Sequence, residues 1–146
     1  MSEEVSVRTL KNLQIRSKFL LYVDFSDTIK SFLLNASAKA LATYGPKGLN
    51  VVPVSVVQVH GYQIWLFDFF MHKTVANIQA NSQVSLAFWS GLQGYQIKGR
   101  ANYQTAGTDF EQAKQYVAKH YPERTLKGLL VLSVDEVWDV SVGGVS

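Results

Sequence analysis

Two tight turns bracket the Val-rich stretch LNVVPVSVVQV (residues 49–59), and they constrain the fold more than any other feature of the sequence. YGPKG precedes the stretch and VHGYQ ends it, and both contain the Gly that commonly marks a turn. Val packs well on a pleated sheet, so the stretch is predicted to be β-structure. Pro53 lies inside it and predicts an edge position, a bulge or a loss of strand pairing at that point.

Three helices are predicted, and each begins at a residue that can cap a helix. Ser26 opens SDTIKSFLLNASA, whose apolar residues recur at helical spacing. Thr74 is expected to cap TVANIQANSQ. In TDFEQAKQYVAKHYPE, Thr108 and Glu111 have the spacing of a capping box, and Pro122 is expected to end the helix.

About six strands are predicted, and those adjacent in the sequence are joined by tight turns. They are ALAT, LNVVPVSVVQV, YQIWLF, VSLAFW, GYQIKGRANYQT and GLLVLSVDEVWDVSV, the last being a closing pair or one long bent strand. In GYQIKGRANYQT, Tyr95 and Ile97 are predicted to face one side of the sheet while Gln96 and Lys98 face the other. This pattern favours a mainly β (α+β) fold, an antiparallel barrel with short helices at its openings.

Composition and charge favour a globular protein. The 146 residues are predicted to form one domain, residues 1–146, because 47% are hydrophobic and only 17% are charged. The net charge of +3 is spread along the chain, so no nucleic-acid partner is expected. The apolar run FLLYVDF is too short to span a bilayer, so no membrane partner is expected and a cytoplasmic protein is the default.

The reactive residues of the chain suggest little chemistry of their own. There is no cysteine, which removes disulfides, thiol catalysis and iron–sulfur clusters. His60, His72 and His120 lie far apart without paired ligand spacing, so no metal is expected. The GxSxG, P-loop and GxGxxG motifs are missing, and the catalytic residues therefore stay unknown. If a reaction occurs, a cofactor is expected to carry it.

The stretch FFMHKTVANI (residues 69–78) places basic residues and a hydroxyl where a strand is predicted to become a helix. The first turn of a helix has free N–H groups and a partial positive charge, which together favour a bound anion. Lys73 would add a point charge and Thr74 a hydroxyl donor. The alternative is an ordinary Thr cap beside a solvated Lys, and the spacing alone leaves both open.

Three further features allow two interpretations each. The backbone of GLNVVPV, freed by Pro53, could bind the polar edge of a flat heterocycle, or the segment could be an irregular strand. Asp68 lies in the apolar stretch WLFDFF, where a lone carboxylate is costly, so it either accepts a hydrogen bond from a ligand or caps a turn. Trp65, Trp89 and Trp138 either pack in the core or cover a ligand ring.

Several of these segments together resemble one protein family. ALATYGPKGLNVVPVSVV, IWLFDFFMHKTVANIQANSQVSLAFW and GYQIKGRANYQTAGTDFE resemble the pyridoxamine 5'-phosphate oxidase-like FMN-binding split β-barrels, most closely their small single-domain members. The resemblance covers residues 26–137 and leaves residues 1–25 as an extension outside it. It implies a six-stranded antiparallel split β-barrel with short flanking helices.

The resemblance also implies a site for FMN. The FMN phosphate would be held at the junction between strand and helix, by His72, Lys73 and Thr74. Residues expected to line or contact the isoalloxazine ring are Asn50, Val51, Val52, Phe67, Asp68, Phe69 and Gln96. Such proteins are homodimers with FMN at the subunit interface, so Trp138 is expected to cover the ring from the partner subunit.

The function implied is that of an FMN-binding flavoprotein, either a flavin-dependent oxidoreductase or a small electron carrier with a small-molecule or protein redox partner. Vitamin B6 oxidation is not implied, because such oxidases grip the substrate phosphate with C-terminal basic residues, whereas this chain ends in VWDVSVGGVS. One alternative is a non-catalytic module that binds or stores a flavin, haem or F420. Another is a structural or regulatory dimer that has lost its cofactor.

Overall fold

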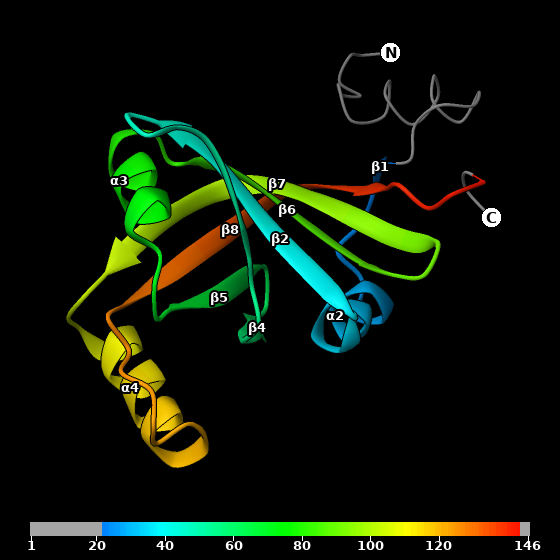
Figure 1. Ribbon diagram of the computed structural model, residues 1–146. Coiled ribbons are helices and arrows are strands. Elements are labelled where there is room, and N and C mark those ends of the chain that lie inside the picture. The colour runs from blue at the N-terminus through cyan, green and yellow to red at the C-terminus, as the bar shows by residue number, and fades with distance from the viewer. Residues whose placement is uncertain (1–21, 144–146) are drawn as a thin grey trace, which may run out of the picture.

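The computed structural model describes residues 22–143, and most of these residues belong to a curved antiparallel sheet with helices at its ends (Figure 1). The strands are β1 (Tyr22–Val23), β2 (Ala38–Gly45), β3 (Gly48–Pro53), β4 (Val57–His60), β5 (Gln63–Asp68), β6 (Gln83–Ser90), β7 (Gln93–Gln104) and β8 (Gly128–Asp139). The helices are α2 (Asp27–Asn35), α3 (His72–Ala80) and α4 (Thr108–His120). Of the predicted N-terminal extension, residues 1–21 lie outside the described residues.

The order of the strands makes the sheet a split barrel. The sheet runs β3-β2-β6-β7-β8-β5-β4, every pairing is antiparallel, and the short β1 pairs with β8. Its two edges, β3 and β4, are consecutive in the sequence and are separated only by residues 54–56. Such a short connection cannot span an open sheet, so the sheet curls until its edges approach each other. The predicted mainly β split barrel is confirmed.

Pro53 accounts for the main difference from the predicted strand count. The Val-rich stretch was expected to be one strand with an irregularity, but it forms both β3 and β4, which lie at opposite edges of the sheet. Proline has no N–H to donate, and β3 ends at this residue. Of the three alternatives predicted at Pro53, the edge position is confirmed, because Pro53 pairs with Ala40 on the edge strand β3. The strand ends at this residue, and the chain then crosses the seam of the barrel, defined here as β3, residues 54–56 and β4.

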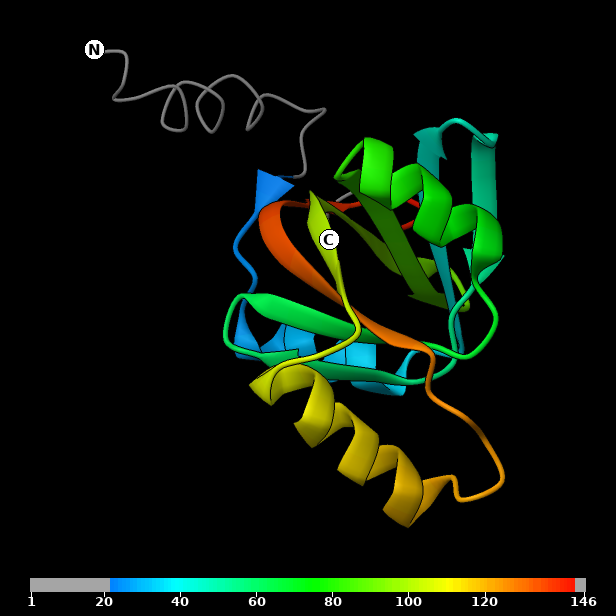
Figure 2. The ribbon, with the colours of Figure 1, turned by 90° about the vertical axis from the view of Figure 1, so that its left-hand side faces the viewer.

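Two clusters of buried side chains form the core. The larger one fills the barrel and includes Leu41, Leu86, Ile97 and Leu132, which are fully buried. The smaller one lies beneath α4, on the other face of β5 and β8. Figure 2 shows α4 running along this side of the barrel, below the hairpin of β4 and β5. Alternate residues of β5 therefore enter different clusters, and this strand is buried on both faces.

Of the three N-cap residues predicted from the sequence, one is confirmed. Ser26 caps α2 as predicted, because its hydroxyl oxygen accepts a hydrogen bond from the N–H of Ile29. The predicted cap at Thr74 is wrong, since α3 begins two residues earlier, at His72. The predicted capping box at Thr108 is also wrong. Gly107 occupies the cap position of α4 with φ +102°, a conformation that glycine adopts readily and other residues avoid.

The two long C-terminal strands match the predicted pattern. Gln96 and Lys98 of β7 lie on the opposite face from the buried Tyr95 and Ile97, as predicted. Of the two alternatives for the last segment, one long strand is correct. A separate finding is that none of the helices in residues 22–143 is both long enough and apolar enough to cross a membrane.

Candidate functional site

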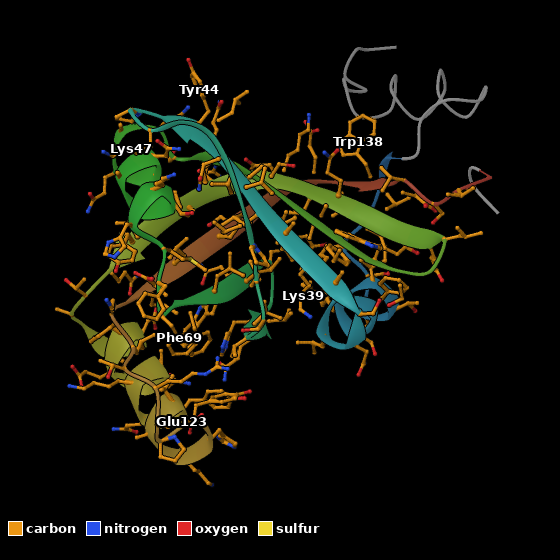
Figure 3. All side chains as sticks on the ribbon, viewed as in Figure 1. Lys39, Tyr44, Lys47, Phe69, Glu123 and Trp138 are labelled. Atoms are coloured by element: carbon orange, nitrogen blue, oxygen red, sulfur yellow. The ribbon has the colours of Figure 1, made fainter. Side chains whose placement is uncertain are left out.

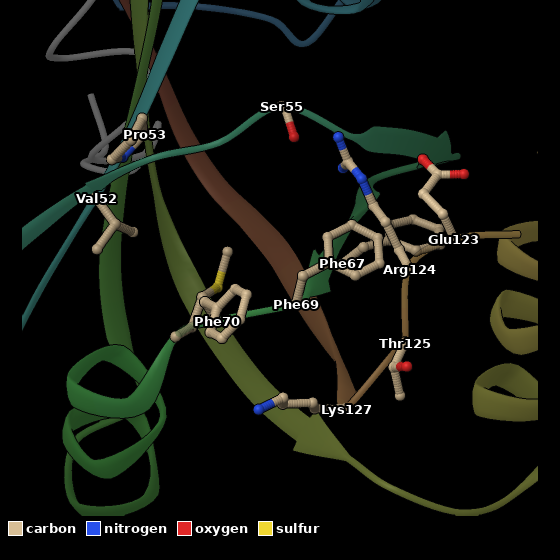
Figure 4. Close-up of a pocket in the computed structure, with 11 residues that line it drawn as sticks. Val52, Pro53, Ser55, Phe67, Phe69, Phe70, Glu123, Arg124, Thr125 and Lys127 are labelled. Carbon is tan, nitrogen blue, oxygen red and sulfur yellow. The ribbon is translucent and has the colours of Figure 1, made fainter. Parts of the chain in front are cut away.

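A cavity of about 720 Å³ opens at the seam of the barrel (Figure 4). Three segments contribute its walls: the end of β3 with the start of the seam connection, the end of β5 with its link to α3, and the loop between α4 and β8. The lining residues are Val52, Pro53, Ser55, Phe67, Phe69, Phe70, Met71, Glu123, Arg124, Thr125 and Lys127. This volume is within the range of small-molecule and cofactor sites.

Aromatic side chains make up one wall, which is called the aromatic wall below. Phe67 lies near the end of β5 and Phe69 directly follows the strand, and both line the cavity and belong to the smaller core cluster, whereas Asp68 between them does not. Phe67 is buried and packs on Tyr116 of α4, with 5.7 Å between ring centroids. Val52 lines the cavity from the edge strand β3. These three residues were among those predicted to lie beside a flat ring.

The start of α3 borders the cavity through Met71. His72 and Lys73 follow in the first turn, and both side chains are exposed. The first hydrogen bond of the helix runs from Val75 N to Met71 O, at 2.8 Å, so the N–H groups before Val75 have no partner within the helix. The predicted junction thus places two basic residues beside free N–H donors.

Thr74 and Asn50, both predicted site residues, contact each other. The side-chain nitrogen of Asn50 (Nδ2) donates a hydrogen bond to the hydroxyl oxygen of Thr74 at 3.0 Å. Thr74 is completely buried, so its hydroxyl joins α3 to β3 instead of pointing into solvent. Asn50 and Val52 lie on the less exposed face of β3, whereas Val51 is 66% exposed on the other face.

Asn77 is a site residue that the sequence reasoning missed. It is fully buried, and its side chain makes three hydrogen bonds to the hairpin of β2 and β3. Its Oδ1 accepts from Lys47 N at 2.8 Å, and its Nδ2 donates to Gly48 O at 2.9 Å and to Thr43 Oγ1 at 3.1 Å. A polar residue one turn beyond Thr74, on the buried face of an amphipathic helix, was the available signal.

Asp68 has a partner from within the chain. The hydroxyl of Tyr103 on β7 donates a hydrogen bond to Oδ2 of Asp68 at 2.6 Å, and the Tyr103 ring lies against Gly128, where any side chain would collide with it. Burial raises the pKa of Tyr103, and the Asp68 carboxylate raises it further. The other carboxylate oxygen of Asp68 is buried without a hydrogen-bond partner in the described part of the chain.

Two cations on the loop between α4 and β8 line the opposite side of the cavity, and both were missed from the sequence. The guanidinium carbon of Arg124 lies 5.0 Å from the ring centroid of Phe69 and 5.1 Å from that of Tyr121. The ammonium nitrogen of Lys127 lies 4.9 Å from the centroid of Phe70. Both residues precede a buried strand, but nothing in the sequence pattern marked them as cavity residues.

Gln96 and Trp138, the remaining predicted residues, lie beside each other but away from the cavity. They are paired in the register of β7 and β8, and the indole nitrogen of Trp138 donates to Glu136 at 2.9 Å. Figure 3 shows Trp138 and Phe69 on different sides of the molecule. Within one chain, these two residues therefore do not reach the other predicted site residues.

The geometry defines the class of protein: a split-barrel protein with a cavity of small-molecule size at its seam. The cavity has an aromatic wall for a flat ring, an adjacent helix start that suits an anion, and no histidine, aspartate or cysteine among its lining residues. The family model for pyridoxamine 5'-phosphate oxidase matches residues 25–141, and the chain belongs to this family. The resemblance noted from residues 26–137 is confirmed.

Solved structures share this fold. HupZ of Group A Streptococcus is 22% identical, with a TM-score of 0.73, over 83% of this chain and 98% of that one. An FMN-binding protein of Syntrophomonas wolfei is 19% identical, with a TM-score of 0.68, over 92% and 95%. An F420 reductase is 14% identical, with a TM-score of 0.57, over 74% and 94%. At these identities the likeness shows the fold alone. Comparison with curated protein sequences gave no match.

Proposed function

We propose that this protein binds FMN in the seam cavity and acts as a flavin-dependent oxidoreductase or small electron carrier. The observation that carries the proposal is the juxtaposition of an aromatic-walled cavity of about 720 Å³ with the start of α3, where His72 and Lys73 are exposed. FMN combines a flat tricyclic ring with a phosphate, and the two halves of the site match these two parts. Bound FMN would supply the electron-transfer chemistry that the lining residues lack.

The phosphate would be held at the start of α3. The unpaired N–H groups of the first turn point along the helix axis, and the helix dipole adds positive potential there. His72 and Lys73 supply side-chain donors. Thr74 would contribute mainly through its backbone, because its buried hydroxyl is bonded to Asn50. The hydrogen bonds of Asn77 keep this helix start in place against the hairpin of β2 and β3.

The ring would lie along the aromatic wall. Phe67 and Phe69 offer apolar surface, and Val52 faces them from the seam. No strand within residues 22–143 pairs with the outer edge of β3, so its backbone near Asn50, Val51 and Val52 could bind the polar edge of a heterocycle. The side chain of Asp68 does not line the cavity and accepts a hydrogen bond from Tyr103, so it would not contact the ring directly.

A second copy of the chain would complete the site. Trp138 and Gln96 lie away from the cavity of their own chain, so they would have to reach an FMN ring from the partner subunit. Apolar side chains suited to such an interface are exposed on β2 and β3, with Tyr44 58% and Leu49 85% exposed. Light scattering coupled to size exclusion would test this. Leu49→Glu should shift a dimer toward the monomer and weaken FMN binding in parallel.

The alternative is a non-catalytic module for flavin, haem or F420. Its non-catalytic character is supported by the lack of an obvious acid or base among the lining residues of the cavity apart from Glu123. The F420 reductase among the proteins that share the fold supports only F420 as a possible ligand. The chromophore separates these possibilities, because flavin, haem and F420 absorb visible light differently.

The test is a visible spectrum of the purified protein with mass spectrometry of the released chromophore. A yellow protein that releases FMN supports the proposal. Lys73→Ala combined with His72→Ala should weaken FMN binding about a hundredfold, because two side-chain donors to the phosphate are lost. Lys119→Ala, an exposed cation on α4, is the matched control. A colourless protein that takes up no added FMN would overturn the proposal.

A further inference from the structure

The loop between α4 and β8 forms a charged wall of the seam cavity, facing the link between β5 and α3. Its cavity-lining residues include Glu123, Arg124 and Lys127, which are all exposed (Figure 4). Neither Arg124 nor Lys127 has an ion-pair partner in the part of the chain that the structure describes. The proposed FMN phosphate lies at the start of α3 and makes no use of these two cations. They are therefore available to a second ligand in the same cavity.

Aromatic rings, not carboxylates, hold the two cations in place. The guanidinium of Arg124 lies near both Phe69 and Tyr121, at 5.0 and 5.1 Å from their centroids. A guanidinium near aromatic faces keeps its N–H donors in its own plane, so it can still bind an oxyanion through two parallel hydrogen bonds. Lys127 lies over Phe70, and its backbone N–H donates to the carbonyl oxygen of Asp68 at 2.9 Å.

The charge of this wall favours one kind of anion. Two cations and the carboxylate of Glu123 leave a single net positive charge, which matches a carboxylate. A phosphate monoester carries about one and a half to two negative charges at neutral pH, which is roughly half a charge to one charge more than this wall neutralises. Phe70, which lies beneath Lys127 and is not assigned to FMN, offers apolar surface to the rest of the ligand.

We propose that Arg124 and Lys127 bind the carboxylate of a small, flat substrate that enters the cavity beside FMN. That the ligand is a substrate rests on the proposed function. Its binding depends only on the cavity and the two cations. Arg124 would orient the carboxylate through its planar donors, and Lys127 would add a point charge. Glu123 would discriminate against anions of higher charge.

Benzoate is the first probe, because it is flat and carries a single carboxylate. Its binding is measured in two ways on the full-length protein: by the change in the visible spectrum of the FMN-loaded form, and by ligand-observed NMR with the FMN-free form. Benzamide, which has the same shape without the charge, should bind at least about tenfold more weakly. Phenyl phosphate should also bind more weakly than benzoate.

Single substitutions then test whether each cation of the charged wall contributes to benzoate binding. Arg124→Gln and Lys127→Gln should each weaken benzoate binding about tenfold, because each removes a charge-assisted hydrogen bond. Arg124→Lys keeps the charge but loses the planar donors, so it should recover only part of the affinity. Lys119→Gln on α4 removes an exposed cation that does not line the cavity, and it should leave benzoate affinity within about twofold. Circular dichroism establishes that each variant is folded.

Different outcomes separate the two proposals. If no FMN binds but benzoate still binds in an Arg124-dependent way, the cofactor proposal fails and the carboxylate wall stands. If FMN binds and benzoate affinity is the same in wild type, Arg124→Gln and Lys127→Gln, the carboxylate wall is overturned. Phenyl phosphate binding more tightly than benzoate would overturn the choice of carboxylate, since the net charge of the wall would then not select the ligand.

Discussion

The two sides of the seam cavity are held by different kinds of contact. The α3 side is fastened by hydrogen bonds of two buried side chains, three between Asn77 and the hairpin of β2 and β3 and one between Asn50 and Thr74. The loop side is held at the surface, where Arg124 and Lys127 lie over aromatic rings. Buried hydrogen bonds are directional and costly to leave unmade, whereas exposed cation–aromatic contacts are weak and tolerant of movement.

This difference suggests a division of labour. A side that is fixed in one geometry suits a resident group that is always bound in the same way, which is the role proposed for the α3 side toward FMN. A side that can adjust suits ligands that enter and leave. The claim that the α3 side is held more firmly than the loop side can be tested by removing individual contacts on each side and measuring the free energy of unfolding.

Asn77→Ala should have the largest effect. It leaves Lys47 N, Gly48 O and Thr43 Oγ1 without their partner and removes a fully buried side chain, so the free energy of unfolding should fall by about 3 kcal/mol. Urea denaturation followed by circular dichroism measures this change. Gln79→Ala, on the exposed face of the same helix, is the control. A loss no larger than that of the control would remove the basis for calling the α3 side fixed.

Tyr103→Phe should have the next largest effect, because it removes the one hydrogen bond that the buried Asp68 carboxylate accepts from residues 22–143. The expected loss at neutral pH is about 1–3 kcal/mol. The pKa of Tyr103 is raised in the folded state, so the folded state keeps the proton longer than the unfolded state. This contribution is fully present below about pH 10, the unfolded pKa of tyrosine, and is lost as the pH rises further.

The same variant therefore gives a test by pH. The difference in unfolding free energy between wild type and Tyr103→Phe should be constant from pH 7 to about pH 9 and should shrink above about pH 10. Tyr44→Phe, at an exposed tyrosine, serves as the control. A difference that grows with rising pH would contradict the assigned direction of the pKa shift.

Thr74→Val should lower the free energy of unfolding by about 1 kcal/mol. The substitution keeps the shape of the side chain but removes the oxygen that accepts from Asn50, and the helix itself gains nothing from the Thr hydroxyl as a cap. Thermal unfolding of the FMN-free protein measures the change. If stability is unchanged while FMN affinity collapses, the hydroxyl serves the ligand and not the framework, and the α3 side is less rigid than its hydrogen bonds suggest.

Arg124→Gln should have the smallest effect on stability, below about 1 kcal/mol, because it removes only cation–aromatic contacts at an exposed position. The same urea series measures it. A loss comparable to that of Asn77→Ala would show that the loop side is as firmly held as the α3 side, and the distinction between the two sides would disappear.

Local sequence signals predicted much of the fold. The turn residues, the Val-rich stretch and Pro53 indicated an antiparallel sheet with a break, and the structure has that break as the seam. Ser26 was recognisable as a cap because its signal is local. Thr74 and Thr108 carried the same signal but lie inside their helices, since Met71 and Gly107 take the cap positions. Capping patterns record what a residue is able to do, and the neighbouring backbone decides whether it does.

The candidate site was predicted only where a local sequence pattern determines the position of a residue. Phe67, Phe69 and Val52 do line one cavity, because strand alternation is readable from the sequence. Arg124 and Lys127 were missed because their position depends on how the chain returns from α4 to β8, which no local pattern encodes. Asn77 was missed because its partners lie about thirty residues earlier in the chain, on a hairpin that meets α3 only after folding.

The place of β8 in the sheet has a consequence for how the chain folds. β8 is the last strand in the sequence, yet it lies between β7 and β5 and also pairs with β1. Until it is in place, the sheet exists as two separate pieces, β3-β2-β6-β7 and β5-β4, and the edges of β7 and β5 that β8 will join present unpaired backbone N–H and C=O groups. The barrel therefore cannot close during synthesis before residues 128–139 have left the ribosome. Closure joins distant parts of the chain, which favours slow folding and a transient risk of aggregation.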